Sequence, residues 1–253
     1  MNLYQVINNL LNKSVYLIDV GAYKGEFTDN SLSNVKKIEC VDMYEPQDSS
    51  FADLKNKFSN NKNINIYNLA IGNENIQKEF YYFENEGYKS SLLKSYENGV
   101  KTSIVEIKTL DSIYTKENMY LDKYDYFLKL DTQGNDLSVL KGAKNFIENS
   151  QPIIFCELIY VPLYENQSYA NEIINYMMEN DYILARLEDV HETVNGFIAY
   201  ADGLFVHKSK LNFDCTSFEL HKDSYCLNLE NVCQERLDLI IKLDEECKRL
   251  QKK

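Results

Sequence analysis

Short apolar runs alternate with amphipathic segments along most of the chain. The runs, which are typical of buried strands in a parallel sheet, fall at residues 15–20, 37–44, 64–71, 124–131 and 152–159. Apolar side chains recur at helical spacing between them, which predicts helices at 26–34, from about 47, at 137–147 and at 172–180. Strands that alternate with helices predict an α/β fold, with crossover helices on both faces of the sheet.

Two regions depart from this alternation. Residues 74–110 contain aromatic stretches and a strict apolar–polar alternation at 105–109, which predicts a β-rich insertion. Further on, residues 182–187 and 204–207 predict two strands separated by a long polar excursion at 188–202, forming a terminal antiparallel hairpin.

The spacing of apolar residues changes in the last part of the chain. From Cys233 onward, apolar residues follow a 3-4 spacing with charges between them. We therefore divide the chain into a domain at 1–208 and a C-terminal extension at 209–253 that ends in an amphipathic helix. The pattern spans fewer than three heptads, so docking of this helix onto the domain is favoured, and pairing into a homodimer is the alternative.

Composition narrows the classes of function. The chain has 253 residues, of which 44% are hydrophobic, and this is enough for one substantial core. The formal net charge of −12 argues against a nucleic-acid partner, because phosphates would be repelled over most of the surface. Six cysteines without a CxxC pair suggest reduced thiols rather than a zinc cluster. With no membrane-length apolar run, we expect a cytoplasmic protein without a membrane span.

Acidic residues close four of the predicted strands: Asp19, Glu45, Asp131 and Glu157. Ligands of an open parallel sheet bind at the carboxyl ends of its strands, so these acids are candidate site residues. Any one of them alone is more simply explained as a helix cap or a turn residue. Four at such strand ends favour a binding edge.

Asp19 leads into a glycine loop, Gly21-x-x-x-Gly25, between a buried strand and a helix. Glycines let backbone N–H groups approach a ligand that a Cβ would exclude. Glu45, at the end of the next strand, is placed to accept the hydroxyls of a cofactor ribose. Because the loop lacks the first glycine of G-x-G-x-x-G, a nucleoside without phosphates is favoured over a dinucleotide. A tight structural turn is the simpler alternative.

These motifs resemble those of the FkbM-type class I S-adenosylmethionine-dependent methyltransferases. The most specific match is residues 128–143, LKLDTQGNDLSVLKGA, against the family pattern K-I-D-x-x-G-x-E-x-x-V-L-x-G-A. Residues 19–22, 44–46 and 69–73 match, in the expected order, the family's first motif, its ribose-binding step and the turn after its third strand. The sequence departs from the pattern at Tyr23, where a small polar residue is frequent, and at Asp136, where Glu is common.

The resemblance implies a Rossmann-like class I methyltransferase fold over residues 1–208, mostly parallel and closed by the antiparallel hairpin. It implies S-adenosylmethionine as the cofactor. The residues that it assigns to the cofactor are Asp19, Gly21, Ala22, Tyr23, Gly25, Glu45, Pro46, Ala70 and Asp131.

The resemblance also implies methyl transfer to oxygen, and we expect the acceptor to be a hydroxyl of a sugar, glycan or sugar-nucleotide precursor. Such a hydroxyl needs a base as it attacks the methyl group in line. Asp131 is the first candidate for the base and Glu157 the second, with Lys129 as a charge partner of either. His191 could reach the site from the polar excursion, although a loop histidine is more simply solvated. A divalent cation held by these acids together with Asp136 is an alternative that we do not favour.

Two rival functions stay open. An NAD-dependent oxidoreductase of Rossmann type would share the sheet and the ribose-binding acid, but the missing glycine and the motif at 128–143 oppose it. A non-catalytic nucleoside-binding module that assembles through the C-terminal helix is opposed by the intact acids. For the acceptor, we expect recognition by residues 81–93, 160–169 and 188–200. Tyr160, Tyr164 and Tyr169 offer flat apolar faces with hydroxyls that suit a sugar, and ordinary packing is the alternative.

Overall fold

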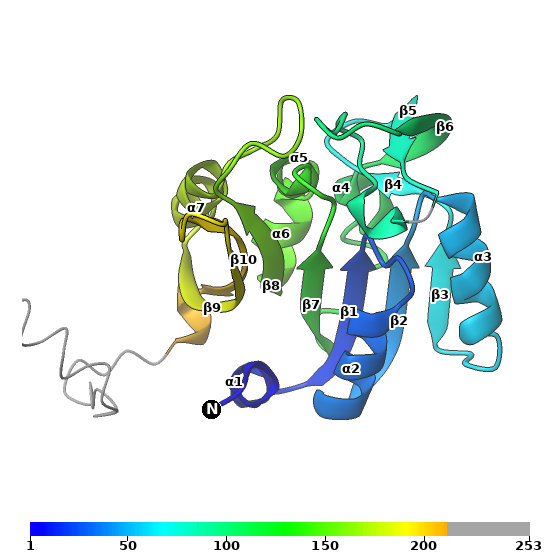
Figure 1. The fold of residues 1–253 in the computed structure, drawn as a ribbon. Helices are drawn as coiled ribbons and strands as arrows, with labels where there is room; N and C mark the ends of the chain where they lie inside the picture. Colours follow the sequence, from blue (N-terminus) through cyan, green and yellow to red (C-terminus); the bar gives the residue numbers. More distant parts are fainter. Residues whose placement is uncertain (85, 212–253) are drawn as a thin grey trace, which may run out of the picture. The chain divides into compact units, whose positions relative to one another are not determined.

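A seven-stranded sheet forms the centre of the computed structural model, which describes residues 1–84 and 86–211 (Figure 1). Its strands are β1 Ser14–Val20, β2 Ile38–Tyr44, β3 Ile64–Tyr67, β7 Tyr124–Leu130, β8 Ile153–Ile159, β9 Tyr182–Glu192 and β10 Ile198–His207. Their order is β3-β2-β1-β7-β8-β10-β9, and neighbours pair in parallel except β10, which runs antiparallel to β8 and β9. The predicted α/β sheet with a terminal antiparallel hairpin is confirmed.

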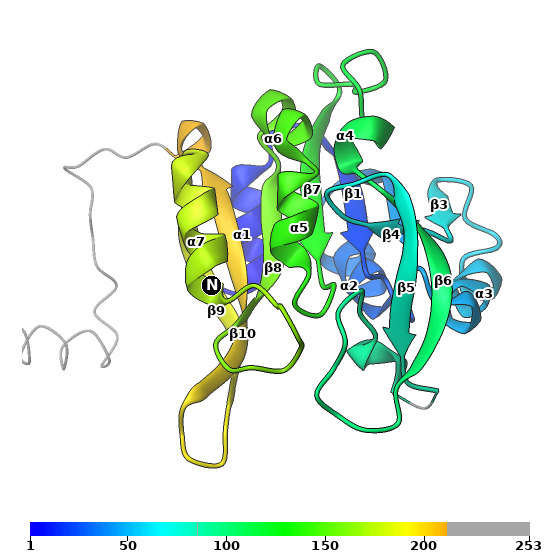
Figure 2. The ribbon, with the colours of Figure 1, turned by 90° about the horizontal axis from the view of Figure 1, so that it is seen from above.

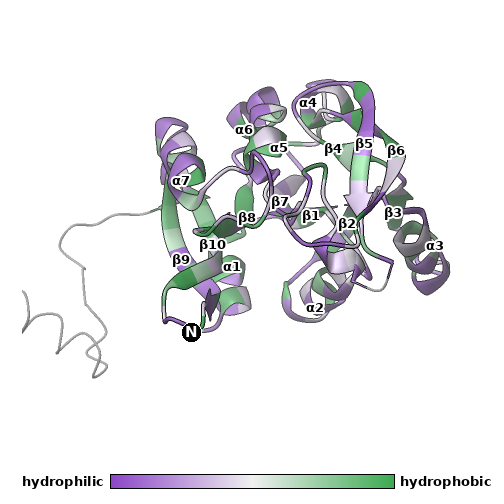
Figure 3. Cartoon of the chain, turned by 45° about the horizontal axis from the view of Figure 1, so that its top comes forward, coloured by the Kyte–Doolittle hydropathy of each residue, from purple (hydrophilic) through white to green (hydrophobic). Residues whose placement is uncertain are grey.

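Helices cover both faces of this sheet (Figure 2). The helices are α1 Leu3–Leu10, α2 Glu26–Asn34, α3 Asp48–Lys57, α4 Leu110–Ile113, α5 Asp136–Lys141, α6 Lys144–Ser150 and α7 Ala170–Glu179. One buried cluster joins the sheet to α1, α2 and α3, and a second joins it to α4, α5, α6 and α7. Every residue of β7 is buried, which is why its sequence lacks the polar alternation of an exposed strand. The helices carry both hydrophilic and hydrophobic residues, as helices with one buried face do (Figure 3).

A small second sheet lies outside the main one. It consists of β4 Ala70–Ile71, β6 Lys101–Lys108 and β5 Ile76–Tyr82, in that order. The single strand predicted at 64–71 is therefore wrong: the chain leaves the main sheet after β3 and joins the small sheet at β4. Between the two strands, the Asn68 amide donates to the carbonyls of Glu45 and Pro46, at 3.2 and 3.3 Å.

The single helix predicted at 137–147 is likewise two helices, α5 and α6. The break contains Gly142, where a Cβ would lie 2.0 Å from the carbonyl oxygen of Gly72. The backbones of these two segments touch, and only glycine permits that approach.

The polar excursion predicted at 188–202 is also wrong, because β9 continues to Glu192 and β10 begins at Ile198, leaving a short turn at 193–197. The register of the two strands shifts at three places, and Asp189 has a positive φ of 44°. Bulges of this kind interrupt the two-residue period that identifies a strand in a sequence. His191 consequently lies in a strand and not in a loop.

The amphipathic helix predicted from Cys233 onward lies outside the described residues. Within the described ranges, no helix combines the length and the apolar character needed to cross a membrane.

Candidate active site

The glycine loop follows β1 and is held by its neighbours on three sides. Gly21 has a φ of 75°, and a Cβ there would lie 2.0 Å from the carbonyl oxygen of Asp131. The Gly21 amide donates to the Tyr44 carbonyl at 3.0 Å, and the Lys129 ammonium donates to the Gly21 carbonyl at 2.7 Å. Glycine is required here by the backbone conformation and by the contact with the loop after β7.

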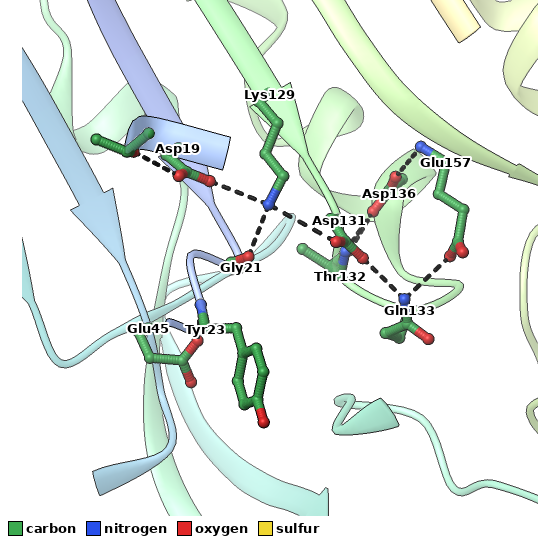
Figure 4. Close-up of polar contacts among 11 residues, drawn as sticks. Asp19, Gly21, Tyr23, Glu45, Lys129, Asp131, Thr132, Gln133, Asp136 and Glu157 are labelled. Atoms are coloured by element: carbon green, nitrogen blue, oxygen red, sulfur yellow. Dashed lines mark hydrogen bonds and ion pairs between the residues drawn. The ribbon is translucent and has the colours of Figure 1, made fainter. Parts of the chain in front are cut away.

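Asp19 and Lys129 form a buried ion pair behind this loop, with 3.0 Å between ammonium and carboxylate (Figure 4). The Thr28 hydroxyl, from α2, donates to the same carboxylate at 2.7 Å. Burial alone would lower the pKa of Lys129, but the carboxylates of Asp19 and Asp131 raise it above its usual value. The lysine therefore stays charged and joins the ends of β1 and β7.

Glu45 ends β2 and is 5% exposed. Its carboxylate accepts hydrogen bonds from the backbone amides of Tyr23 and Gln47, each at 2.8 Å. Burial raises the pKa of Glu45 to about 7, against the two amide donors that favour the ionised form. The carboxylate is thus fixed in orientation beside the glycine loop.

A pocket opens above these groups, and we call it the glycine-loop pocket. It is lined by Val20, Gly21, Tyr23, Tyr44, Glu45, Pro46, Leu69, Ala70, Ile71, Phe80, Gly87, Tyr88, Ser90, Leu92, Asp131, Thr132, Gln133 and Asn135. Of the residues that the sequence assigned to the cofactor, six lie on its wall: Gly21, Tyr23, Glu45, Pro46, Ala70 and Asp131. The structure places Asp19, Ala22 and Gly25 behind the wall, where Asp19 pairs with Lys129 and Gly25 begins α2.

A second pocket adjoins the first, and we call it the carboxylate pocket. Its lining is Tyr88, Lys89, Ser95, Glu97, Asp131, Gln133, Glu157, Leu163, Tyr164, Asp189, His191, Tyr200 and Asp202. The two pockets share Tyr88, Asp131 and Gln133. All three segments from which we expected acceptor recognition contribute to this second pocket, and the His191 ring stacks on Tyr200 with 4.5 Å between ring centroids.

Carboxylates crowd this second pocket because β10 lies beside β8. Asp202 pairs in register with Glu157 across the two strands. Burial and the neighbouring Asp131 carboxylate raise the pKa of Asp202 to about 7. Burial, with repulsion from Asp131, Asp136 and Asp202, raises the pKa of Glu157 well above its usual range. Glu157 therefore binds its proton more tightly than a solvated glutamate does, and an approaching positive charge would favour its ionised form.

Asp136 has a structural role. Its carboxylate accepts from the backbone amide and the hydroxyl of Thr132 and, at 3.1 Å, from the backbone amide of Glu157. Burial raises its pKa to about 6. It ties the loop after β7 to β8 and does not face the pockets. Within residues 1–84 and 86–211, no group of three or more His, Cys, Asp or Glu side chains has the arrangement of a metal site.

Residues that sequence reasoning missed occupy the junction and the far wall of the carboxylate pocket. Gln133 lies between Asp131 and Glu157, and its side-chain amide donates to both (Figure 4). Asp202 gave one usable signal, a carboxylate inside an otherwise apolar strand. Tyr88 lies in the segment 81–93 from which we expected acceptor recognition, but nothing in the sequence distinguished it from the other residues there.

Two features define the class I methyltransferase fold. The first is the strand order, in which β10 lies antiparallel between β8 and β9, and the second is the pocket at the carboxyl ends of β1, β2 and β7. A solved structure with this fold, methyltransferase FkbM from Methylobacillus flagellatus KT, is 18% identical to the chain with a TM-score of 0.50. The match covers 76% of this chain and 43% of that one, so the chain spans less than half the length of that protein. The sequence model of the methyltransferase FkbM domain matches residues 19–184, and the chain belongs to this family.

Other solved structures are similar at lower scores. An rRNA methylase from Streptococcus thermophilus is 10% identical over 81% of this chain and 93% of that one, with a TM-score of 0.42. TrmK from M. capricolum, in complex with S-adenosyl-homocysteine, is 12% identical over 82% of this chain and 69% of that one, also with a TM-score of 0.42. None of the curated proteins compared with the chain matches it.

Proposed function

We propose that this protein transfers a methyl group from S-adenosylmethionine to a hydroxyl of a sugar or glycan precursor. The observation that carries the proposal is the junction of two pockets at Tyr88, Asp131 and Gln133. A transfer between two molecules requires adjoining binding sites, with the reacting atoms in contact at their boundary.

The glycine-loop pocket suits a nucleoside with an amino-acid tail. Glu45 is fixed by two backbone amides and has lone pairs left for the ribose hydroxyls. The Gly21 carbonyl accepts one hydrogen bond from Lys129 and has a lone pair left for the ammonium of the tail. The apolar side of the pocket, which includes Leu69, Ala70 and Phe80, suits the adenine. When bound, the cofactor supplies an electrophilic methyl group, whose sulfur leaves as a neutral thioether.

The carboxylate pocket suits an acceptor rich in hydroxyls. Carboxylates accept hydrogen bonds from hydroxyls, and the tyrosine rings at 88, 164 and 200 offer flat apolar faces. As the acceptor oxygen bonds to the methyl carbon, its proton passes to a carboxylate, for which Asp131 and Glu157 are the candidates. The electron pair of the carbon–sulfur bond would stay on the sulfur of the bound cofactor, and the carboxylate would hold the proton from the acceptor.

Calorimetry tests the cofactor assignment. We expect S-adenosyl-homocysteine to bind and NAD to give no heat, because the loop lacks the glycine that makes room for a pyrophosphate. Binding of NAD alone would overturn the proposal in favour of the oxidoreductase. Glu45→Gln should weaken S-adenosyl-homocysteine about tenfold by the loss of a charged hydrogen-bond acceptor.

Methyl transfer tests the acceptor class. The protein is incubated with S-adenosylmethionine labelled in the methyl group and a panel of sugars, glycans, sugar nucleotides and non-sugar amines, and label in the acceptor is measured. Transfer to a sugar oxygen supports the proposal. Transfer only to nitrogen of non-sugar acceptors would contradict it while leaving the cofactor assignment intact.

A further inference from the structure

Gln133 occupies the boundary of the two pockets and bridges the two candidate bases. Its side-chain nitrogen lies 2.8 Å from an oxygen of Asp131 and 3.3 Å from an oxygen of Glu157 (Figure 4). Its side-chain oxygen accepts from the Tyr164 hydroxyl at 2.7 Å. The amide nitrogen donates to an oxygen of each acid and the amide oxygen accepts from the Tyr164 hydroxyl, so the orientation of the amide is determined.

The position of this amide is fixed from the backbone side as well. Gln133 has a positive φ of 54°, an unusual conformation for a residue other than glycine. The Ser91 hydroxyl lies 3.1 Å from the carbonyl oxygen of Thr132 and 2.8 Å from that of Gln133, which holds the turn in place. A strained turn that its neighbours stabilise in this way is typical of residues with a positioning role.

The two acids that Gln133 bridges differ in their surroundings. Asp131 lines both pockets, its side chain is 46% exposed, and the Lys129 ammonium lies 3.7 Å away. Glu157 lines only the carboxylate pocket. The titratable and charged groups that face Glu157 are Lys129 and Asp131 at the end of β7, Asp136 in α5, Asp202 and Tyr200 in β10, and Tyr164 after β8.

We propose that Gln133 is a positioning residue that gives the two acids different roles: it aims Glu157 into the carboxylate pocket as the base for the acceptor and holds Asp131 at the boundary toward the methyl donor. The proposal rests on the proposed function and goes one step beyond it, because it ranks Glu157 above Asp131 as the base. A group that takes a proton must be in reach of the acceptor, and Glu157 faces only the acceptor's pocket.

Carbon-13 NMR of protein labelled at the glutamate carboxyl carbon tests this without cofactor or acceptor. The Glu157 signal is assigned as the one missing from Glu157→Gln, and its titration midpoint is measured. Gln133→Met keeps the length of the side chain but lacks the N–H donors. We expect the titration midpoint of Glu157 to rise by about 1 pH unit in this variant, because the ionised carboxylate loses a hydrogen bond. The same change at the exposed Gln77 should leave it unchanged.

Tyr164→Phe provides a second variant in case Gln133→Met does not fold. It removes only the hydroxyl that anchors the amide oxygen, and we expect a smaller rise of the Glu157 midpoint. An unchanged or lowered midpoint in whichever variants fold would overturn the proposal. Since the samples contain no S-adenosylmethionine, failure here is distinct from failure of the proposed function, which the calorimetry reports.

Discussion

The two pockets that meet at Asp131 are built by different means. The glycine-loop pocket is formed largely by the ends of β1, β2, β4 and β7, and Glu45 there is oriented by backbone amides. The carboxylate pocket is formed by side chains from β8, from the loops before β6, after β7 and after β8, and from the hairpin of β9 and β10. Backbone geometry therefore determines the shape of the glycine-loop pocket, whereas the identity of the side chains determines that of the carboxylate pocket.

The largest expected effect separates chemistry from cofactor binding. Glu157→Gln should lower kcat about 10³-fold by removing the base, while the affinity for S-adenosyl-homocysteine should change less than about threefold, because Glu157 does not line the glycine-loop pocket. Turnover with an acceptor found in the panel, together with calorimetry, measures both. A large loss of S-adenosyl-homocysteine affinity would show that the two pockets are not separable.

The second prediction concerns the backbone of the first pocket. Gly21→Ala should lower the free energy of unfolding by about 3 kcal/mol or more, because the residue has a φ of 75° and the added carbon would meet the Asp131 carbonyl. The matched control is Gly196→Ala, where φ is 78° and the added carbon would meet nothing within 4 Å, so only the conformational cost of about 1 kcal/mol remains. Urea unfolding of both variants measures the difference. Equal losses would mean that the contact with Asp131 does not matter.

The third prediction follows from the crowding in the second pocket. The pKa of Asp202 is about 7 in the folded protein and near 4 when unfolded, so the folded state binds the extra proton. The resulting stability is fully present below about pH 4 and is lost as pH rises through about 7. Asp202→Asn should therefore gain up to about 4 kcal/mol relative to wild type at pH 8 but little at pH 4.

Thermal or urea unfolding across this pH range provides the measurement. Asp122→Asn, at an exposed position, is the control and should follow the wild-type curve. A constant difference between Asp202→Asn and wild type at all pH values would show that Asp202 is not held protonated.

The smallest expected effect links the two pockets. A sulfonium at their boundary would favour the ionised forms of Glu157 and Asp202, whereas the neutral thioether of the product would not. Binding of S-adenosylmethionine at pH 7 should release on the order of half a proton more than binding of S-adenosyl-homocysteine. Calorimetry in two buffers of different ionisation enthalpy measures the release, and equal values for the two ligands would contradict the coupling.

The same contrast explains what the sequence could predict. Gly21 and Glu45 follow from local patterns at strand ends, because the order of strands and a short motif already determine where they lie. The role of Gln133 and the approach of Asp202 to Glu157 depend on which strand pairs with β8 and in which register. Bulges in β9 and β10 hid that pairing, and with it the position of His191, which the sequence placed in a loop.

The contact between Gly21 and the carbonyl of Asp131 also bears on engineering. It joins the loops after β1 and β7 through their backbones, so neither can be remodelled without disturbing the other. The hairpin of β9 and β10 has no such contact at its exposed turn, where a Cβ added at Gly196 would meet nothing within 4 Å. A designer who wants a different acceptor should therefore exchange the hairpin of β9 and β10 and leave the contact between the loops after β1 and β7 intact.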